Sequence, residues 1–360
     1  MRPSPTRLGS VVGLTGCYLV SLVAGWCFHS MRLPLPWMIG PLVGTAILAL
    51  CGVTTRPLPV CTRPTGQAVV ATTVGLAFSA EALQAALRSL PLLLGLAAMT
   101  TVLALAVSVL QARLARTRLS RMLVATFPVA PVEAAVIASD LGLPVAPVVI
   151  AQSLRIAGIV VMIPLALHAL AGGETPGPRV TDWTAGFDTP SALVLPVMGL
   201  VGAAAARWMG WANPYFLGPL SLAAAISALG LSLPPYPPLV LAGAQVLLGS
   251  WLGSTFQPAV ITSARREIAI SAAGTALLLL LTSLGAALLS LAAQPGWRVL
   301  VLAAAPGGVT EMALTARALH ESVTLVTAAQ VVRVFALMPL ARPLIRWSER
   351  FDPPVAAAPP

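Results

Sequence analysis

The chain of 360 residues is 58% hydrophobic and only 9% charged, with a mean hydropathy of +0.90. Because soluble domains carry about 25% charged residues, this composition excludes an ordinary soluble protein and is typical of a chain that lies in lipid. The net charge of +10 comes from arginines that fall between apolar segments, a pattern typical of membrane topology. The sequence contains no basic recognition motif, so we do not expect direct nucleic-acid binding.

Six apolar segments follow one another in each half of the chain, and we expect membrane helices there. In the first half the expected segments are 11–27, 37–53, 67–79, 91–110, 122–139 and 145–167. In the second half they are 192–206, 215–231, 239–256, 268–293, 299–318 and 323–340. The sequence therefore predicts an all-α integral membrane protein.

The two halves form an internal duplication, because a shift of 178 residues aligns rare residues of one half on the same residues of the other. Such a match in one register is hard to obtain by chance in a chain rich in Ala and Leu. We predict a first membrane repeat at 11–170, a linker loop at 171–190, a second membrane repeat at 191–346 and a disordered tail at 347–360. The matched residues include Pro36 and Pro214, Gly40 and Gly218, Gln67 and Gln245, Pro128 and Pro306, Glu133 and Glu311, Gln152 and Gln330, and Arg155 and Arg333.

The fifth segment of each half is expected to be a broken helix. Pro128 and Pro131 interrupt the first copy, and Pro306 with Gly307 and Gly308 interrupts the second. A membrane tolerates a broken helix only where it is buried in protein or faces a cavity.

Arginine placement leaves two topologies open. If the fifth segments enter and return, ten spans form inverted repeats with fourteen arginines inside and four outside. If all twelve segments cross, the repeats are parallel and the count is thirteen against five. Both topologies place both termini in the cytoplasm, and we expect a multi-pass protein of a bacterial inner membrane.

Ionisable residues within membrane segments are costly and are therefore candidates for function. Each half supplies a Glu after the break, and an Arg with a Gln three residues earlier on the same helix face. One interpretation is a structural ion pair between Glu and Arg. The other is a polar site near the membrane midplane, in which Arg binds an anion and Glu takes up a proton or cation. The predicted binding residues are Glu311, Arg333, Gln330, Gly307, Gly308, Glu133, Arg155, Gln152, Gln67 and Gln245.

No metal, cofactor or catalytic residue is predicted. His29, His168 and His320 are far apart and unduplicated, and no ligand spacing is present among them or the four cysteines.

The stretch from Ala305 to Met312, followed by Gln330 and Arg333, resembles the signature of the AbrB membrane-protein family. Leu35-Pro36-Trp37 with Gly40 and the duplication resemble it too. The first half departs from the pattern, since Val129 and Ala130 replace the paired glycines and Pro131 is added. The family's fold resembles that of cation–proton antiporters and bile-acid symporters, which use inverted repeats with broken helices. Members are also labelled transcriptional regulators or ammonia monooxygenases.

Three functions follow as hypotheses. The first is a secondary transporter of a small, perhaps anionic solute, coupled to H⁺ or Na⁺. The alternative is a membrane-associated regulator of gene expression without direct DNA binding, as the family label implies. Ammonia monooxygenase activity lacks the metal ligands it would need, so we do not expect an enzyme. Membrane lipid and the solute are the expected partners, and a homo-oligomer is left open.

Overall fold

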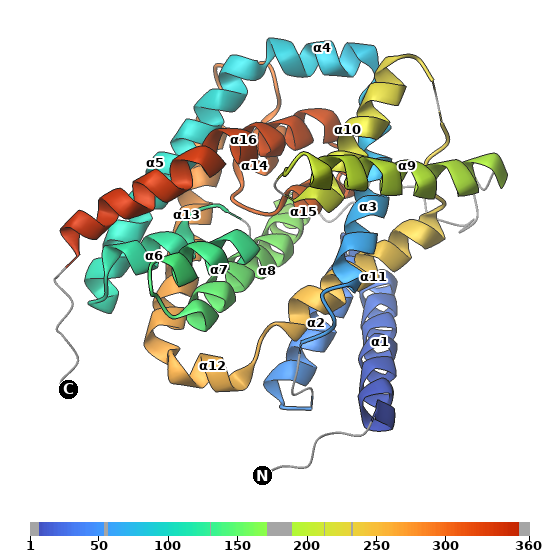
Figure 1. Ribbon diagram of the computed structural model, residues 1–360. Coiled ribbons are helices and arrows are strands. Elements are labelled where there is room, and N and C mark those ends of the chain that lie inside the picture. Colours follow the sequence, from blue (N-terminus) through green and yellow to red (C-terminus); the bar gives the residue numbers. More distant parts are fainter. Residues whose placement is uncertain are drawn as a thin grey trace. The chain divides into compact units, whose positions relative to one another are not determined.

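The computed structural model describes residues 7–53, 57–129, 131–170, 189–211, 213–231 and 233–352. This part of the chain is helical and contains no strand. Its first half holds eight helices (Figure 1): α1 (Arg7–Ser30), α2 (Pro36–Leu50), α3 (Thr62–Gly75), α4 (Ala80–Arg88), α5 (Leu90–Ala115), α6 (Leu119–Thr126), α7 (Pro131–Asp140) and α8 (Val145–Leu170).

The second half holds eight helices in the same order, followed by a short 3-10 helix. They are α9 (Thr189–Trp208), α10 (Pro214–Ala228), α11 (Pro238–Ser254), α12 (Pro258–Ser263), α13 (Arg265–Leu289), α14 (Trp297–Ala304), α15 (Val309–Ala318), α16 (Val323–Ser348) and η1 (Glu349–Phe351).

The helix boundaries follow the sequence repeat. Both ends of α2, α6, α7 and α8 recur 178 residues later as the ends of α10, α14, α15 and α16. The backbone recurs as well: Leu35 before α2 has a φ of 49°, and its equivalent Asn213 before α10 has a φ of 50°. Superposition of the halves and their relative orientation stay predictions.

The predicted segments leave out α4 and α12, and the predicted linker and tail overlap the described residues only in part. The predicted linker 171–190 lies outside the described residues except for its last two, which begin α9. The tail expected from 347 onward instead continues α16 to Ser348 and then forms η1. Residues 353–360 lie outside the described part.

Four helical stretches of the described chain are long and apolar enough to cross a membrane: Leu90–Ala115, Val145–Leu170, Pro238–Ser263 and Arg265–Leu289. The number rises to six if each of two bent pairs is one span, namely α3 with α4, bent by 92°, and the two parts of α16, bent by 51°. Shorter apolar helices include α2 and α10.

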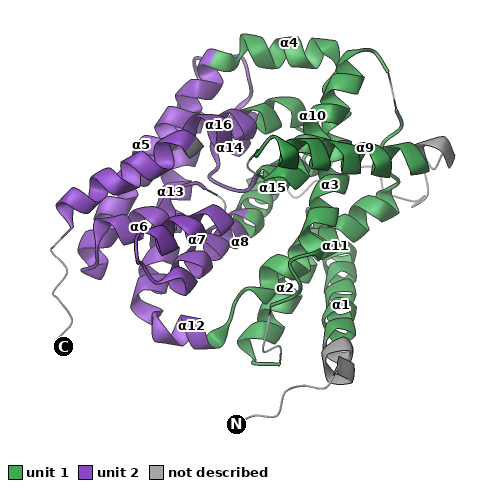
Figure 2. Ribbon diagram, viewed as in Figure 1, with its two compact units in different colours: residues 1–90, 160–258, 309–328 green, residues 91–159, 259–308, 329–360 purple. Residues whose placement is uncertain are grey.

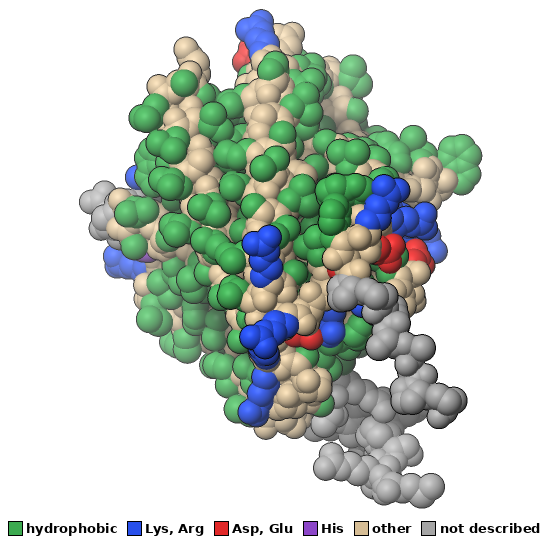
Figure 3. Space-filling model, turned by 90° about the vertical axis from the view of Figure 1, so that its left-hand side faces the viewer, with side chains coloured by type: hydrophobic (Ala, Val, Ile, Leu, Met, Phe, Trp, Pro, Cys, Tyr) green, Lys and Arg blue, Asp and Glu red, His purple; other side chains and the backbone are tan. Residues whose placement is uncertain are grey.

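Hydrophobic side chains also cover most of the face in Figure 3, where charged ones occur in a few separate groups. The protein is thus a multi-pass membrane protein, and the choice between ten and twelve spans stays a prediction.

The described chain divides into two compact units (Figure 2), and each draws on both sequence halves. Unit 1 comprises residues 1–90, 160–258 and 309–328, and unit 2 comprises 91–159, 259–308 and 329–360. The units therefore do not follow the repeats, because each contains equivalent helices from both halves.

Unit 1 is built from equivalent helix pairs. In it α2 packs against α1 and α11, whereas its equivalent α10 packs against α9 and α3. Glycines permit the close approach: a Cβ at Gly40 would lie 2.6 Å from the main-chain oxygen of Ala24 in α1, and a Cβ at Gly218 would clash with Gly202 in α9. Gly40 and Gly218 therefore serve helix packing, as small residues commonly do in membranes.

Unit 2 contains both parts of the first interrupted helix, α6 and α7, and the first part of the second, α14, whereas α15 belongs to unit 1. In unit 2, α6 packs against α7 and α13, and α13 packs against α14. A buried apolar cluster joins the break to the C-terminal helix, with Phe127 and Val129 from the break, Ala134 and Ile137 from α7, and Leu337, Ala341 and Ile345 from α16.

We predict that Gly40→Ala lowers the stability of the protein by about 1–3 kcal/mol, because the added methyl group overpacks the α1–α2 contact. Gly243→Ala in α11 is the matched control, because a Cβ there meets nothing within 4 Å. That change should be neutral or stabilise by up to about 1 kcal/mol. The midpoint of thermal unfolding in detergent measures both, and equal midpoints would contradict the packing role of Gly40.

Candidate functional site

Each half contains a helix that stops and restarts at the proline predicted to break it. α6 ends at Thr126 and α7 begins at Pro131, while α14 ends at Ala304 and α15 begins at Val309. The last four carbonyl groups of a helix have no partner within it. In a membrane no water replaces that partner, so each break needs donors from elsewhere in the protein.

In the first half, Gln152 and Arg155 on α8 supply these donors. The side-chain amide of Gln152 donates to the carbonyls of Val124 and Phe127 at 2.6 and 3.1 Å. The guanidinium of Arg155 donates to Thr126 and Phe127 at 2.9 and 2.7 Å. Its second terminal nitrogen donates to Val129 at 3.2 Å. We call this arrangement the α8 clamp.

In the second half, Gln330 and Arg333 on α16 make the equivalent clamp. Gln330 donates to Leu302, Ala303 and Ala305 at 2.9, 3.3 and 3.2 Å. Arg333 donates to Ala305 at 2.5 Å and to Gly307 at 2.7 Å, and also to the side-chain oxygen of Gln330. We call it the α16 clamp. In both halves the Arg reaches the carbonyl of the residue that follows the proline of the break, so the planar guanidinium binds the interrupted backbone as well as the helix end.

The clamps explain how two arginines are held inside unit 2. Arg155 and Arg333 are only 2% and 3% exposed. Each guanidinium lies at the carbonyl end of a helix, where the helix dipole is negative and favours a cation. Both arginines are thus fixed positive charges that belong to the breaks.

Glu133 and Glu311 occupy the first turn of the helix that follows each break. The N-terminal end of a helix is positive, which favours a carboxylate there. Glu311 belongs to unit 1 and is attracted by Arg63 of α3, a helix that packs against α15. The guanidinium of Arg63 lies 4.5 Å from the centre of the Trp251 ring on α11, in a cation–π contact.

Arg63 and Trp251 were missed as site residues by the sequence analysis, which used Arg63 only for topology. Neither residue is duplicated, since Leu241 and Thr73 occupy the equivalent positions. The available signal was an arginine four residues before Gln67, on the same helix face.

The predicted site residues fall in both units. Unit 2 holds the first-half trio and the α16 clamp, namely Glu133, Gln152, Arg155, Gly307, Gly308, Gln330 and Arg333, whereas unit 1 holds Gln67, Gln245 and Glu311. Gln67 and Gln245 are buried on α3 and α11, which pack together. Arg155 donates to main-chain carbonyls at the first break, and its pairing with Glu133 stays a prediction. The pairing of Glu311 with Arg333 stays a prediction.

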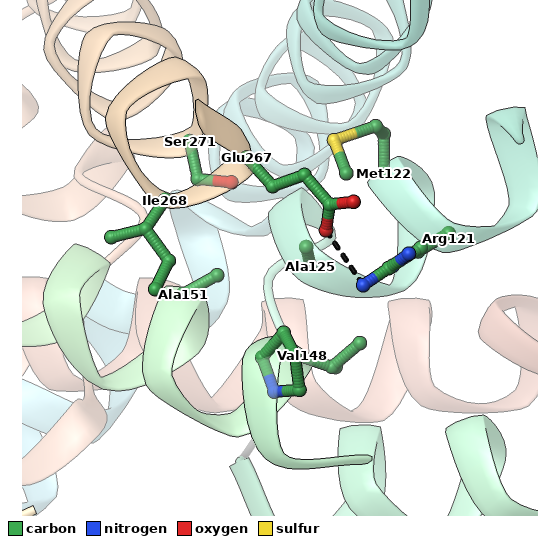
Figure 4. Close-up of a pocket in the computed structure, with 9 residues that line it drawn as sticks. Arg121, Met122, Ala125, Val148, Ala151, Glu267, Ile268 and Ser271 are labelled. Atoms are coloured by element: carbon green, nitrogen blue, oxygen red, sulfur yellow. Dashed lines mark ion pairs between the residues drawn. The ribbon is translucent and has the colours of Figure 1, made fainter. Parts of the chain in front are cut away.

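A further ion pair fastens the first broken helix. Arg121 on α6 and Glu267 on α13 approach to 2.7 Å, with side chains 20% and 21% exposed. They line a small pocket with residues of α8 such as Val148 and Ala151 (Figure 4). The pair thus holds α6 laterally, while the α8 clamp holds its end.

Helices of this length and hydropathy, with interrupted members clamped by buried side chains, define a polytopic α-helical membrane protein. The family model described as "Transition state regulatory protein AbrB" matches residues 3–171 and 63–349. The chain belongs to this AbrB family. The two overlapping matches suggest a duplication, as the sequence predicts. No curated protein matches the chain.

Within the described ranges, no three His, Cys, Asp or Glu residues gather as metal ligands.

We predict that Arg333→Gln destabilises the protein by about 1–3 kcal/mol for each carbonyl that loses its donor. Arg333→Lys should recover only part of the loss, because an ammonium group lacks the planar fork that spans Ala305 and Gly307. Arg350→Gln, at an exposed position in η1, is the matched control and should stay within about 0.5 kcal/mol. Thermal unfolding in detergent measures all three, and full stability of Arg333→Gln would contradict the clamp.

Proposed function

We propose that the protein is a secondary transporter of a small solute in the bacterial inner membrane. The observation that carries the proposal is the pair of interrupted helices, each with a clamped carbonyl end and a carboxylate at the start of the following helix. Discontinuous membrane helices are used by many transporters to build solute and ion sites. The wider likeness to cation–proton antiporters and bile-acid symporters, with inverted repeats, is part of the proposal and rests on analogy.

The two carboxylates are the exchangeable groups in this proposal. The arginine donors serve main-chain carbonyls, so releasing them to bind a solute would leave those carbonyls unpaired. A carboxylate, in contrast, can bind a proton or a cation and release it without breaking the fold. Glu133 and Glu311 are therefore assigned to binding H⁺ or Na⁺ together with the solute, and Gly307 and Gly308 to close backbone approach at the second break.

We predict that Glu311→Gln leaves a folded protein whose solute flux, or the pH dependence of that flux, is lost. Proteoliposomes that contain the purified protein, screened with candidate solutes, measure the flux. Glu81→Gln, at an exposed position of α4, is the control and should transport like the wild type. Full flux with unchanged pH dependence in Glu311→Gln would refute the role of this carboxylate.

A regulator of gene expression is the second candidate, because the matched family carries a regulatory description. A regulator that senses the membrane would act without solute flux and would alter expression of other genes when deleted. If no solute is transported while Glu311→Gln reproduces the deletion phenotype, the regulatory hypothesis replaces transport. No catalytic residue is assigned in either proposal.

We further propose that both termini and the 113–121 turn face the cytoplasm, because arginines concentrate there. Fusions of a cytoplasm-active reporter at the C-terminus and at residue 117 should be active, whereas periplasm-active reporters at the same points should be silent. A periplasmic signal at the C-terminus would exclude both the ten-span and the twelve-span topology.

A further inference from the structure

Arginines gather in unit 2 where α5 ends and α13 begins. The two helices lie side by side and run in opposite directions, because Val107 of α5 packs with Leu278 deep in α13, whereas Leu114 near the end of α5 meets the first turn of α13. There the guanidinium of Arg266 donates to the carbonyl of Leu114 at 3.0 Å. The end of α5, the turn to α6 and the start of α13 thus carry what we call the arginine cluster: Arg113, Arg116, Arg118, Arg265 and Arg266.

The arginine cluster lacks counter-charges within the described part of the chain. None of its five members forms an ion pair with another described residue. Two carboxylates lie beside the cluster, and both have other partners. Glu267 pairs with Arg121 at 2.7 Å, and Asp352 accepts from the backbone N–H groups of Leu119 and Ser120 at 2.5 and 3.3 Å. The positive charge of the cluster is therefore left for a ligand to neutralise.

The starts of α6 and α13 differ in how they are neutralised. The first N–H groups of a helix have no partner within it, and the helix dipole makes this end positive. At α6 the carboxylate of Asp352 supplies the negative charge. The residue before α13 provides no side-chain cap, and the acid of its first turn, Glu267, is paired with α6. The start of α13 thus places Arg265 and Arg266 at a positive helix end, an arrangement that an anion stabilises.

The two helices that carry the cluster also present apolar surface. In the apolar stretches of α5 and α13 only 39% and 22% of the residues are buried, against 67% in α8. Next to the arginines on α5, Val109, Leu110 and Leu114 are exposed. A soluble anion would leave these side chains uncovered, whereas a ligand with a negative headgroup and apolar chains fits both the helix ends and the helix faces.

We propose that the arginine cluster binds the headgroup of an anionic phospholipid, such as phosphatidylglycerol, whose acyl chains lie along α5 and α13. The inference goes beyond the proposed transport and does not rest on it. Guanidinium groups bind phosphate oxygens through charge-assisted hydrogen bonds, and basic clusters at the ends of membrane helices attract anionic lipids. Arg266, which is fixed on the carbonyl of Leu114, and the arginines of the α5–α6 turn supply the donors.

The test is equilibrium binding of radiolabelled phosphatidylglycerol to the purified, immobilised full-length protein in a nonionic detergent. We expect saturable binding that salt weakens, because the attraction is electrostatic. Phosphatidylcholine with the same acyl chains has no net charge and should compete at least about tenfold more weakly. Inorganic phosphate, which lacks the acyl chains, should compete weakly as well. These comparisons use the wild-type protein, so they do not depend on the folding of a variant.

A pair of double variants locates the site. Arg113 and Arg88 are exposed in the last turns of α5 and α4, and Arg116 and Arg32 are exposed residues with φ values of 53° and 57°. Arg113→Gln with Arg116→Gln should weaken phosphatidylglycerol binding by about tenfold or more. Arg88→Gln with Arg32→Gln removes the same charge from matching backbone positions and should bind like the wild type. Arg113→Lys with Arg116→Lys should keep most of the affinity, because it keeps the charge.

Three results would overturn the proposal. Absence of saturable phosphatidylglycerol binding, or equal competition by phosphatidylcholine, would show that no site here recognises an anionic lipid. An equal loss of affinity in the two glutamine double variants would show that net charge, and not the arginine cluster, attracts the lipid. Inorganic phosphate that competes as well as unlabelled phosphatidylglycerol would assign the cluster to a soluble anion.

Discussion

The rest of the structure depends on one constraint: a main-chain carbonyl removed from water needs a donor. Two helices of unit 2 stop at prolines and leave their last carbonyls without partners. Gln and Arg, three residues apart on α8 and again on α16, supply the donors at the same positions in both halves. The interrupted backbone, the buried arginines and the position of the following carboxylate are therefore parts of one arrangement.

This arrangement separates fixed charges from variable ones. The arginines neutralise helix ends and cannot leave without exposing carbonyl groups, so their charge is structural. The carboxylates lie at helix starts, where a change in protonation or a bound cation leaves the backbone hydrogen bonds intact. A transporter needs both kinds of group, because coupling requires a charge that changes inside a framework that does not.

The sequence predicts the backbone plan well and the side-chain partners poorly. The two breaks could be predicted because Pro128 and Pro306 interrupt apolar segments, whereas α4 and α12 were not among the predicted segments. Spacing also placed Gln152 with Arg155 on one helix face. The spacing does not indicate whether that helix face contacts a carboxylate or several main-chain carbonyls, because every residue has a carbonyl and the sequence does not distinguish those that accept. Arg63 was not predicted for a related reason: Trp251, which it contacts, and Glu311, which it attracts, lie far from it in the chain.

The lengths of the helices could not be predicted from composition either. The apolar segment at 37–53 was predicted to form a membrane helix, yet α2 has only 15 residues. Pro36 begins the helix, and Cys51 follows its last residue, with Gly52 at a φ of 73°. Its equivalent α10 is equally short. Such helices cross a bilayer of ordinary thickness only with help from the segments that flank them.

Packing in unit 1 shows why the two halves act as one fold. α2 of the first half lies against α11 of the second, where Cβ atoms at Gly249 and Gly253 would clash with the backbone of α2. Equivalently, α10 lies against α3, where Gly75 meets Leu220 and Ala223. A single half would therefore leave its glycine-lined faces without the helices that fit them. The predicted duplication would supply both members of each contact within one chain. The two carboxylates nevertheless differ in environment, since Glu311 is attracted by Arg63 whereas Glu133 lines a cavity with Arg342.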